Sequence, residues 1–262
     1  MNAYYLLSKY RDIESKMGSK QYKTDVMTYA IDKHKEGYED DMGDAMKLYR
    51  QRFQDLLYRP FAGHAANEDF SIIAQSNLLI GTSATTVLET GLALHRLYGV
   101  PYIPGTALKG LTANYCHSRL GREDNRFQQG GDYFNILFGS QGQQGFICFY
   151  DAFPHPCCVK NALKLDFITP HHKTYYQVSD EHGRTVPAPR DDDSPEPIPF
   201  IAAKGAFRVM LTCERQDEAG TYWLQIAKDI LMQALAQEGI GSKTNSGYGR
   251  FEIMTLQGDQ LW

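Results

Sequence analysis

Apolar residues recur at helical spacing in two segments of the chain. The first begins at Gly105, and the second covers residues 223–238. In the second segment, Lys228, Asp229 and Gln233 lie opposite the apolar side, and Gly239 follows where a left-handed glycine commonly ends a helix. Both segments are therefore predicted to be helices with one buried face, made by Leu108, Leu111, Tyr115 and Cys116 in the first and by Ala227, Ile230, Leu231, Ala234 and Leu235 in the second.

The first 59 residues are polar and predicted to be helical. Residues 44–58 place Leu48, Phe53, Leu56 and Leu57 near one helical face, and Pro60 is expected to end that helix. The charge-rich stretch of residues 33–44 is expected to be solvated. The sequence leaves open whether these helices pack on the core or dock a neighbouring protein.

Several short apolar runs predict strands. Polar loops are expected at residues 82–89 and 121–131. Residues 179–199 contain five prolines and the acidic run Asp191–Asp193, so we expect a mobile, exposed loop there. Strands mixed with single helices indicate an α+β fold with a mostly antiparallel sheet, and the strand segments are Phe70–Gly81, Gly145–Phe153, Leu163–Pro170, Phe200–Ile201, Ala206–Cys213 and Gly249–Leu256.

Composition and charge narrow the class of protein. The chain has 262 residues, of which 42% are hydrophobic, and a formal net charge of −4. It has no long apolar run and no signal-peptide pattern at its start, so we expect a cytoplasmic protein without a membrane span. The net charge argues against an RNA-binding surface over the whole molecule, but it allows a local basic groove. The five cysteines contain no CxxC pair and are expected to be reduced core thiols.

The most informative segment is the glycine-rich run from Gly239 to Phe251, GIGSKTNSGYGRF. Four glycines surround one lysine, and exposed backbone N–H groups beside a lysine can hold phosphate oxygens. A nucleotide-binding P-loop does not fit, because Ser242 separates Gly241 from Lys243 and the order is helix, loop, strand. A plain flexible turn into the last strand would need fewer glycines.

A second candidate anion site lies at the start of the helix that follows Pro104. Lys109 stands in the first turn, where a cation opposes the helix dipole unless an anion binds there. Taken alone, Lys109 fits a solvated lysine better. Together with the glycine-rich run it favours an anion site.

The two motifs Ile103–Leu111 (IPGTALKGL) and Gly239–Phe251 resemble the hallmark motifs of the RAMP superfamily of CRISPR proteins. Further matches occur at residues 87–102, 149–154, 166–171 and 197–200, in consistent order from about residue 70 to 255. Together they resemble the terminal RAMP subunit of the type III-B (Cmr) effector complex. The resemblance implies a ferredoxin-like (RRM-like) RAMP domain over residues 61–262, preceded by an N-terminal helical extension over residues 1–60.

The resemblance also implies a non-catalytic architectural subunit that caps the backbone filament and holds the 3′ part of the guide RNA for antiviral defence. Its implied partners are the guide RNA, the target RNA indirectly, the backbone RAMP subunits and the small helical subunits, with no cofactor. Contacts to phosphate and 2′-OH groups are expected, since any spacer must be accepted. Tyr248 either stacks on a base or packs in the core. By position, the implied RNA-binding residues are Thr106, Lys109, Gly241, Lys243, Thr244, Asn245, Ser246, Gly247, Tyr248 and Arg250.

Two other functions compete with this one. A metal-independent RAMP endoribonuclease that processes CRISPR RNA would need a general base such as histidine. We expect His95 to be a satisfied core histidine, His182 to be solvated, and the pair His171–His172 to be surface or RNA-facing. The run Asp191–Asp193 is expected to be solvated rather than a magnesium site. A module that contacts only proteins would explain the net charge but not the glycine-rich run.

Overall fold

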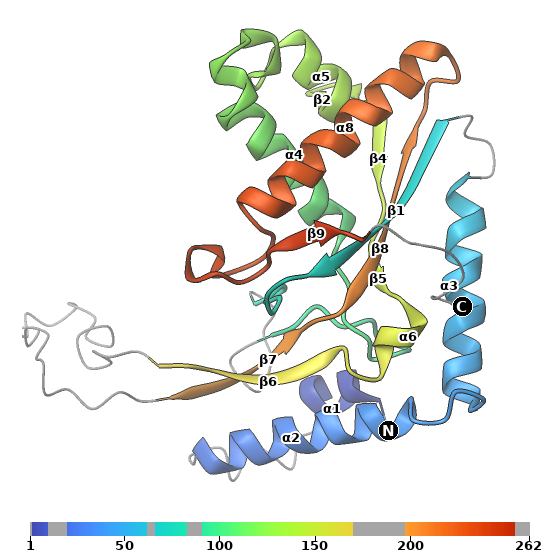
Figure 1. Ribbon diagram of the computed structural model, residues 1–262, viewed down its shortest axis with the longest axis vertical. Helices are drawn as coiled ribbons and strands as arrows, with labels where there is room; N and C mark the ends of the chain where they lie inside the picture. The colour runs from blue at the N-terminus through green and yellow to red at the C-terminus, as the bar shows by residue number, and fades with distance from the viewer. Residues whose placement is uncertain (1, 10–19, 62–65, 83–90, 170–196, 255–262) are drawn as a thin grey trace, which may run out of the picture.

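A computed structural model describes residues 2–9, 20–61, 66–82, 91–169 and 197–254. Nineteen helices, short helical turns and strands are arranged as an α+β fold (Figure 1). In chain order they are α1 (Ala3–Lys9), α2 (Lys20–Gly37), α3 (Asp44–Phe61), β1 (Ala66–Ala74), α4 (Gly105–Ser118), η2 (Leu120–Arg122), η3 (Asn125–Phe127), α5 (Asp132–Phe138), β2 (Gly139–Ser140), β3 (Gln143–Gln144), β4 (Ile147–Phe149), β5 (Phe153–Pro154), α6 (Pro156–Val159), β6 (Leu163–Ile168), β7 (Ile198–Ala203), β8 (Ala206–Cys213), α8 (Glu218–Gln237), η4 (Thr244–Ser246) and β9 (Phe251–Ile253).

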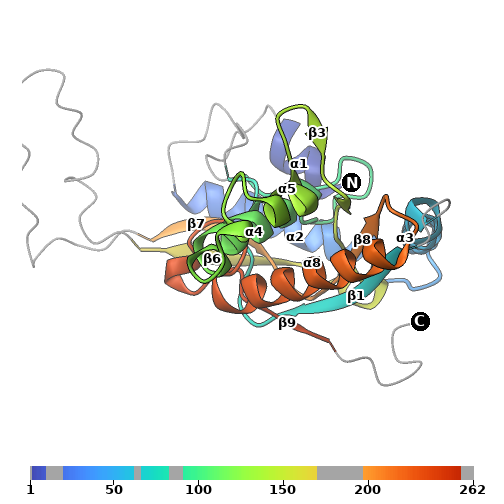
Figure 2. The same cartoon turned by 90° about the horizontal axis from the view of Figure 1, so that it is seen from above.

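The main sheet has the strand order β4-β8-β1-β9, with β5 also beside β8, and every pair is antiparallel. On one face of β1, Phe70 and Ile72 join Val209 and Leu211 of β8 in the core. The helices α4 and α8 cover this face, contributing Leu108 and other buried side chains (Figures 1 and 2). Each large apolar side chain buried here stabilises the fold by about 1.5–3 kcal/mol.

A second, smaller sheet pairs β6 with β7. One of its faces packs on α1 and α2, where Leu163 and Ile201 contact a cluster that includes Leu6 and Ile31. Its other face carries Phe200, which packs with Leu79 of the segment after β1. The N-terminal helices therefore pack on the core, a point that the sequence left open.

Most predicted elements of the second half are confirmed, with changed boundaries. The expected buried face of α8 is buried, but the helix begins at Glu218 because Asp217 accepts a hydrogen bond from the Gly220 N–H (2.9 Å) and so caps it. The final strand is shorter than expected, and the polar loop at 121–131 contains the turns η2 and η3. The strand expected at 145–153 is divided into β4 and β5.

The strand predicted at residues 70–81 is partly wrong. β1 starts at Ala66 and ends at Ala74, and the chain then leaves the main sheet to reach β7, where Leu78 forms a single bridge with Ala203. The polar residues from Gln75 to Asn77 mark this change of direction. The apolar run after them resembles a continuing strand because it is also buried: Leu78 and Ile80 lie in the main core, and Leu79 packs against Phe200 of β7.

The N-terminal predictions need three corrections. α3 ends at Phe61, one residue beyond Pro60, since a proline in the last turn removes only one hydrogen bond of the helix. Leu48 is 59% exposed, so its place on the buried face is wrong, whereas Phe53 is buried as predicted, together with Met46 and Tyr49. The side chains of Leu56 and Leu57 lie outside the described residues. The stretch 33–44 is not wholly solvated, because it includes the buried residues His34 and Tyr38.

The long proline-rich loop ends earlier than expected. Residues 170–196 lie outside the described residues, and so do the expected loop at 83–89, His171, His172, His182 and Asp191–Asp193. The last part of the predicted loop, Ile198 and Pro199, belongs to β7. Together with Phe200 and Ile201 they form a continuous apolar run, which is the signal of a buried strand that the prolines obscured.

Candidate nucleic-acid interface

The loop between α8 and β9 is held in left-handed backbone at five positions. The four glycines Gly239, Gly241, Gly247 and Gly249 have φ of 74°, 94°, 89° and 71°. Lys243 has φ 59° and is the one non-glycine residue with positive φ in the described part of the chain. Glycine adopts this region without penalty, whereas a lysine there is strained.

Close backbone contacts explain three of these glycines. A Cβ on Gly249 would lie 1.9 Å from the Ile240 carbonyl oxygen, and one on Gly241 would lie 2.3 Å from the Leu79 carbonyl oxygen. A Cβ on Gly239 would lie 2.9 Å from the Gly249 carbonyl oxygen. Gly247 differs, since nothing lies within 4 Å of its Cβ position. The base of the loop is therefore tightly packed, whereas its tip is open.

The tip of the loop is exposed and polar. Lys243, Asn245, Ser246 and Gly247 are exposed, and the turn η4 is closed by a hydrogen bond from the Ser246 N–H to the Lys243 carbonyl (2.9 Å). Within the described ranges, no acceptor takes the N–H of Thr244 or Asn245, and no carboxylate pairs with Lys243. A left-handed residue followed by a helical turn presents successive N–H groups to an anion.

The segment after β1 fixes this loop from behind. Ser242 donates its N–H to the Leu79 carbonyl (2.7 Å), and its hydroxyl lies 2.9 Å from the Thr82 hydroxyl. Gly249 donates to the Asn77 carbonyl (2.9 Å), and Ser76 accepts the N–H of Arg250 at 3.0 Å. Sequence reasoning missed these supporting residues, because the contacts join positions roughly 160 to 175 residues apart and leave no local signal.

Tyr248 is anchored to the second sheet. Its hydroxyl donates to Asp166 Oδ2 (3.0 Å), Asn77 donates to the same oxygen (2.7 Å), and its ring packs against Phe200 at 5.9 Å. Burial opposes ionisation of Asp166, but these hydrogen bonds, with one from the Phe167 N–H, hold the pKa of that carboxyl below its usual value. The structure therefore favours the core role for Tyr248 over base stacking.

Arg250 joins the loop to the end of α8. Its guanidinium donates to the Ala236 carbonyl (3.5 Å), and its own carbonyl accepts the Gln75 N–H (2.9 Å). A cation at a helix C-terminus is favourable, because it offsets the partial negative charge of the free carbonyls. Part of the role of Arg250 is thus structural.

The N-terminus of α4 already holds an anionic side chain. The Gly105 N–H donates to Asp151 Oδ1 (2.7 Å), so a carboxylate occupies one of the donors proposed for a phosphate. Thr106 is exposed and Lys109 is half-buried, lying close enough to Cys148 of β4 to oppose the burial that raises the pKa of that thiol. No hydrogen bond or ion pair between described residues links this N-terminus with the glycine-rich loop.

The histidines with side chains inside the molecule are poorly placed for RNA cleavage. His155 is 4% exposed, its Nε2 lies 2.8 Å from the Ser71 hydroxyl, and burial together with Arg208 lowers its pKa to about 4. His95 is stacked on Tyr98, and its buried Nδ1 has no partner among the described atoms, so the prediction of a satisfied core histidine is wrong. Burial lowers the pKa of His95 as well.

The described residues contain no group of three or more His, Cys, Asp or Glu side chains arranged to hold a metal ion. The cysteines are only partly core residues: Cys116 and Cys213 are buried, but Cys157 is exposed. Among the helices described, none is long and apolar enough to cross a membrane.

Comparison with known proteins supplies the family. A family model described as the RAMP superfamily matches residues 71–252. The CRISPR system Cmr subunit Cmr6 of Pyrococcus furiosus is 29% identical over 256 residues, which cover 79% of this chain and 73% of that protein. The CRISPR system CMR subunit Cmr6 of Saccharolobus solfataricus is 26% identical over 200 residues, which cover 72% of this chain and 58% of that protein.

A solved structure gives the same picture for the fold. The cryo-EM structure of the type III-B Cmr-beta bound to cognate target RNA contains a chain that matches with a TM-score of 0.63 and 21% sequence identity. The match covers 94% of this chain and 75% of that chain. At this identity the likeness concerns the fold alone.

Proposed function

The chain belongs to the RAMP superfamily, and from that premise we propose that it is an architectural subunit of a type III-B (Cmr) CRISPR effector complex that holds guide RNA. The two relatives with Cmr6 names support the complex. The position at the end of the backbone filament, on the 3′ part of the guide RNA, is part of the proposal. So are the partners: the guide RNA, the target RNA indirectly, the backbone RAMP subunits and the small helical subunits.

The observation that carries RNA binding is the strained lysine at the tip of the loop. Glycine would fit the backbone of Lys243 better, and four glycines surround it, yet this position carries an exposed cation with no described partner. Strained backbone at an exposed, charged position supports a functional role. The adjacent N–H groups of Thr244 and Asn245 complete a cradle for a phosphate, and neither Lys243 nor these groups distinguish one base from another.

A ferredoxin-like domain is the second part of the proposal. Counted without β5, the main sheet and its two helices follow the chain order β1, α4, β4, β8, α8, β9, and the spatial order is β4-β8-β1-β9. This order supports the split β-α-β arrangement, in which the helices cross one face of an antiparallel sheet. The domain is proposed to cover residues 61–262, with residues 1–60 as a helical extension that packs on it.

The subunit is proposed to be non-catalytic. A nuclease that uses the RNA 2′-OH as nucleophile needs a base that titrates near neutral pH and can reach solvent. His155 meets neither condition, since it is buried and has a pKa of about 4. Processing of CRISPR RNA by a metal-independent endoribonuclease is the competing function. A cleavage assay with precursor RNA and the purified chain separates the two.

The test uses the tagged full chain expressed with its own CRISPR operon, in wild-type form and with Lys243→Glu, Lys243→Gly or Lys47→Glu. Lys47 is an exposed lysine on α3, so its variant matches the charge change of Lys243→Glu. We expect both Lys243 variants to lower the affinity for guide RNA by about tenfold, as expected for one charge-assisted contact. The salt dependence should also become weaker.

The glycine variant separates charge from folding. It relieves about 1–2 kcal/mol of left-handed strain, which offsets the roughly 0.4–1 kcal/mol that the greater freedom of a glycine costs in the unfolded chain. The isolated chain should therefore be at least as stable as wild type. Guide-length RNA recovered at wild-type levels with every variant would contradict the proposal. Recovery of the chain alone, without RNA or other RAMP subunits, would contradict membership of an effector complex.

A further inference from the structure

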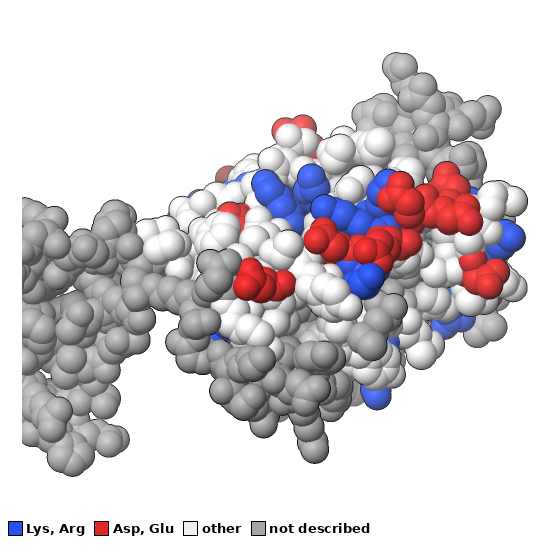
Figure 3. Space-filling view, turned by 90° about the horizontal axis from the view of Figure 1, so that it is seen from below, with Lys and Arg blue, Asp and Glu red and all other residues white. Residues whose placement is uncertain are grey.

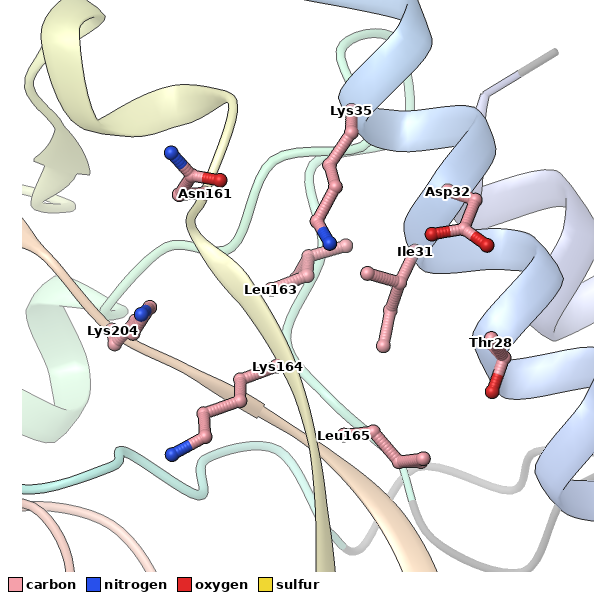
Figure 4. Close-up of a pocket in the computed structure, with 9 residues that line it drawn as sticks. All are labelled: Thr28, Ile31, Asp32, Lys35, Asn161, Leu163, Lys164, Leu165 and Lys204. Carbon is pink, nitrogen blue, oxygen red and sulfur yellow. The ribbon is translucent and has the colours of Figure 1, made fainter.

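A cleft between α2 and the outer edge of β6 has no role in the proposed RNA site. It has a volume of about 260 Å³, and its α2 side is formed by Ile31, Asp32 and Lys35 (Figure 4). Its other side is formed by Leu163, Leu165 and the neighbouring residues of β6. The cleft is smaller than the roughly 300–1,000 Å³ of most small-molecule sites, so it suits part of a larger ligand.

The free edge of β6 indicates the shape of that ligand. β6 pairs with β7 along one edge, and no described strand pairs with its other edge. An unpaired strand edge presents a row of backbone N–H and C=O groups that can bind an extended peptide as an added strand. Leu163 and Leu165 share one face of β6. Leu163 is buried against Ile31, whereas Leu165 is only half-buried and offers its remaining apolar surface to alternate side chains of such a peptide.

The charges at the cleft indicate the composition of the ligand. Lys35 extends from α2 toward Leu163, and Lys164 and Lys204 also line the cleft (Figure 4). Within the described residues none of the three lysines forms an ion pair, whereas Lys33 on the same helix pairs with Glu36. The α2 face of the molecule mixes positive and negative side chains (Figure 3), but three cationic side chains and one carboxylate line the cleft itself.

We propose that this cleft binds an extended segment of another protein in which acidic and aliphatic residues alternate. Its backbone would pair with the free edge of β6, its aliphatic side chains would rest on the partly exposed Leu165, and its carboxylates, on the opposite side of the added strand, would reach Lys164 and Lys204. RNA is the less suitable occupant, because no aromatic or arginine side chain lines the cleft to stack on a base.

The proposal is tested with the full chain and a fluorescent peptide of alternating glutamate and valine, six residues long to match β6. Fluorescence anisotropy measures its affinity for wild type, Lys164→Glu, Lys204→Glu and the charge-matched control Lys47→Glu, after thermal unfolding has shown that each variant is folded. We expect Lys164→Glu and Lys204→Glu each to weaken binding about tenfold, and Lys47→Glu to change it little. A peptide N-methylated at alternate positions should bind at least about tenfold more weakly, because strand pairing needs its N–H groups.

Three results would overturn the proposal: no binding of the peptide to wild type, equal binding to Lys164→Glu and Lys47→Glu, or displacement of the peptide by single-stranded oligouridylate. The last result would assign the cleft to RNA. Lys243→Glu should leave peptide binding unchanged, because Lys243 does not line the cleft. The outcome is therefore independent of the proposed guide-RNA function.

Discussion

The base of the glycine-rich loop offers a sharp test, because two of its glycines share a left-handed backbone but differ in their surroundings. Gly249 has φ 71°, and a Cβ there would lie 1.9 Å from the Ile240 carbonyl oxygen. Gly247 has φ 89°, and nothing lies within 4 Å of its Cβ position. The pair Gly249→Ala and Gly247→Ala therefore separates backbone strain from steric crowding.

The expected magnitudes follow from the contacts. Left-handed backbone costs an alanine about 1–2 kcal/mol, and this is the whole expected effect of Gly247→Ala. In Gly249→Ala the added methyl group also displaces the hydrogen bonds from Ile240 to Gly249 (2.8 Å) and from Gly249 to Asn77 (2.9 Å). Each bond contributes about 0.5–1.5 kcal/mol. The total for Gly249→Ala is therefore about 2–5 kcal/mol.

Urea and thermal unfolding of the two variants and wild type measure these differences. At about 2–4 °C per kcal/mol for a chain of this size, Gly249→Ala should lower the Tm by roughly 4–20 °C and Gly247→Ala by roughly 2–8 °C. Gly247→Ala should retain the loop and bind RNA. Equal losses of stability in the two variants would refute the reasoning, because the packing of Gly249 on Ile240 would then contribute nothing.

Three further predictions concern side chains around the two candidate sites. Burial and Arg208 lower the pKa of His155 to about 4, so the unfolded chain binds a proton at this residue more readily than the folded chain does. The contribution of His155 to stability is therefore full above about pH 6.5 and falls by roughly 3 kcal/mol at most as the pH drops toward 4. Urea unfolding at a series of pH values should show a flatter profile for His155→Gln than for wild type. Asp151→Ala removes the acceptor at the α4 N-terminus and should lower the free energy of unfolding in urea by about 0.5–2 kcal/mol. If that N-terminus contacts phosphate, filter binding should show tighter RNA binding by the variant. Unchanged or weaker binding would exclude the α4 N-terminus from the RNA site. Tyr248→Phe should lower the free energy of unfolding by about 0.5–1.5 kcal/mol and raise the pKa of Asp166 measured by NMR, because the hydroxyl no longer donates to that carboxylate. RNA affinity should stay within about twofold of wild type. A larger loss of affinity would instead indicate direct contact of the hydroxyl with RNA.

The sequence predicts the buried face of a helix well where apolar residues cover a broad side of it, and poorly where only a narrow stripe of side chains is buried. α8 carries small and branched apolar residues along its whole length, so its buried face is evident from the pattern. Among its described side chains, α3 buries a narrow stripe of Met46, Tyr49 and Phe53, whereas Leu48 is exposed. The path of residues 75–81 depends on pairing with β7, more than 100 residues later, which no local pattern specifies.

The candidate site shows the same division. Its glycines and Lys243 are visible in the sequence, because left-handed backbone has a strong preference for residue type. The carboxylate that occupies the α4 N-terminus is 46 positions from Gly105, and the partner of Tyr248 is 82 positions away. Such contacts depend on the completed fold, so the sequence left Tyr248 ambiguous and did not indicate Asp151 at all.

The net charge of −4 is compatible with binding a polyanion once paired and unpaired cations are distinguished. Lys228 of α8 pairs with Glu68 of β1 at 2.6 Å, and Arg208 of β8 pairs with Asp69 of β1. These cations are neutralised locally and add little to the attraction of RNA. Lys243 stands exposed beside free N–H groups at the end of a rigid loop, so its charge remains available to a phosphate. Attraction of RNA therefore depends on the position of the unpaired cations rather than on the net charge. A chain with a negative net charge can still bind a guide RNA at one face.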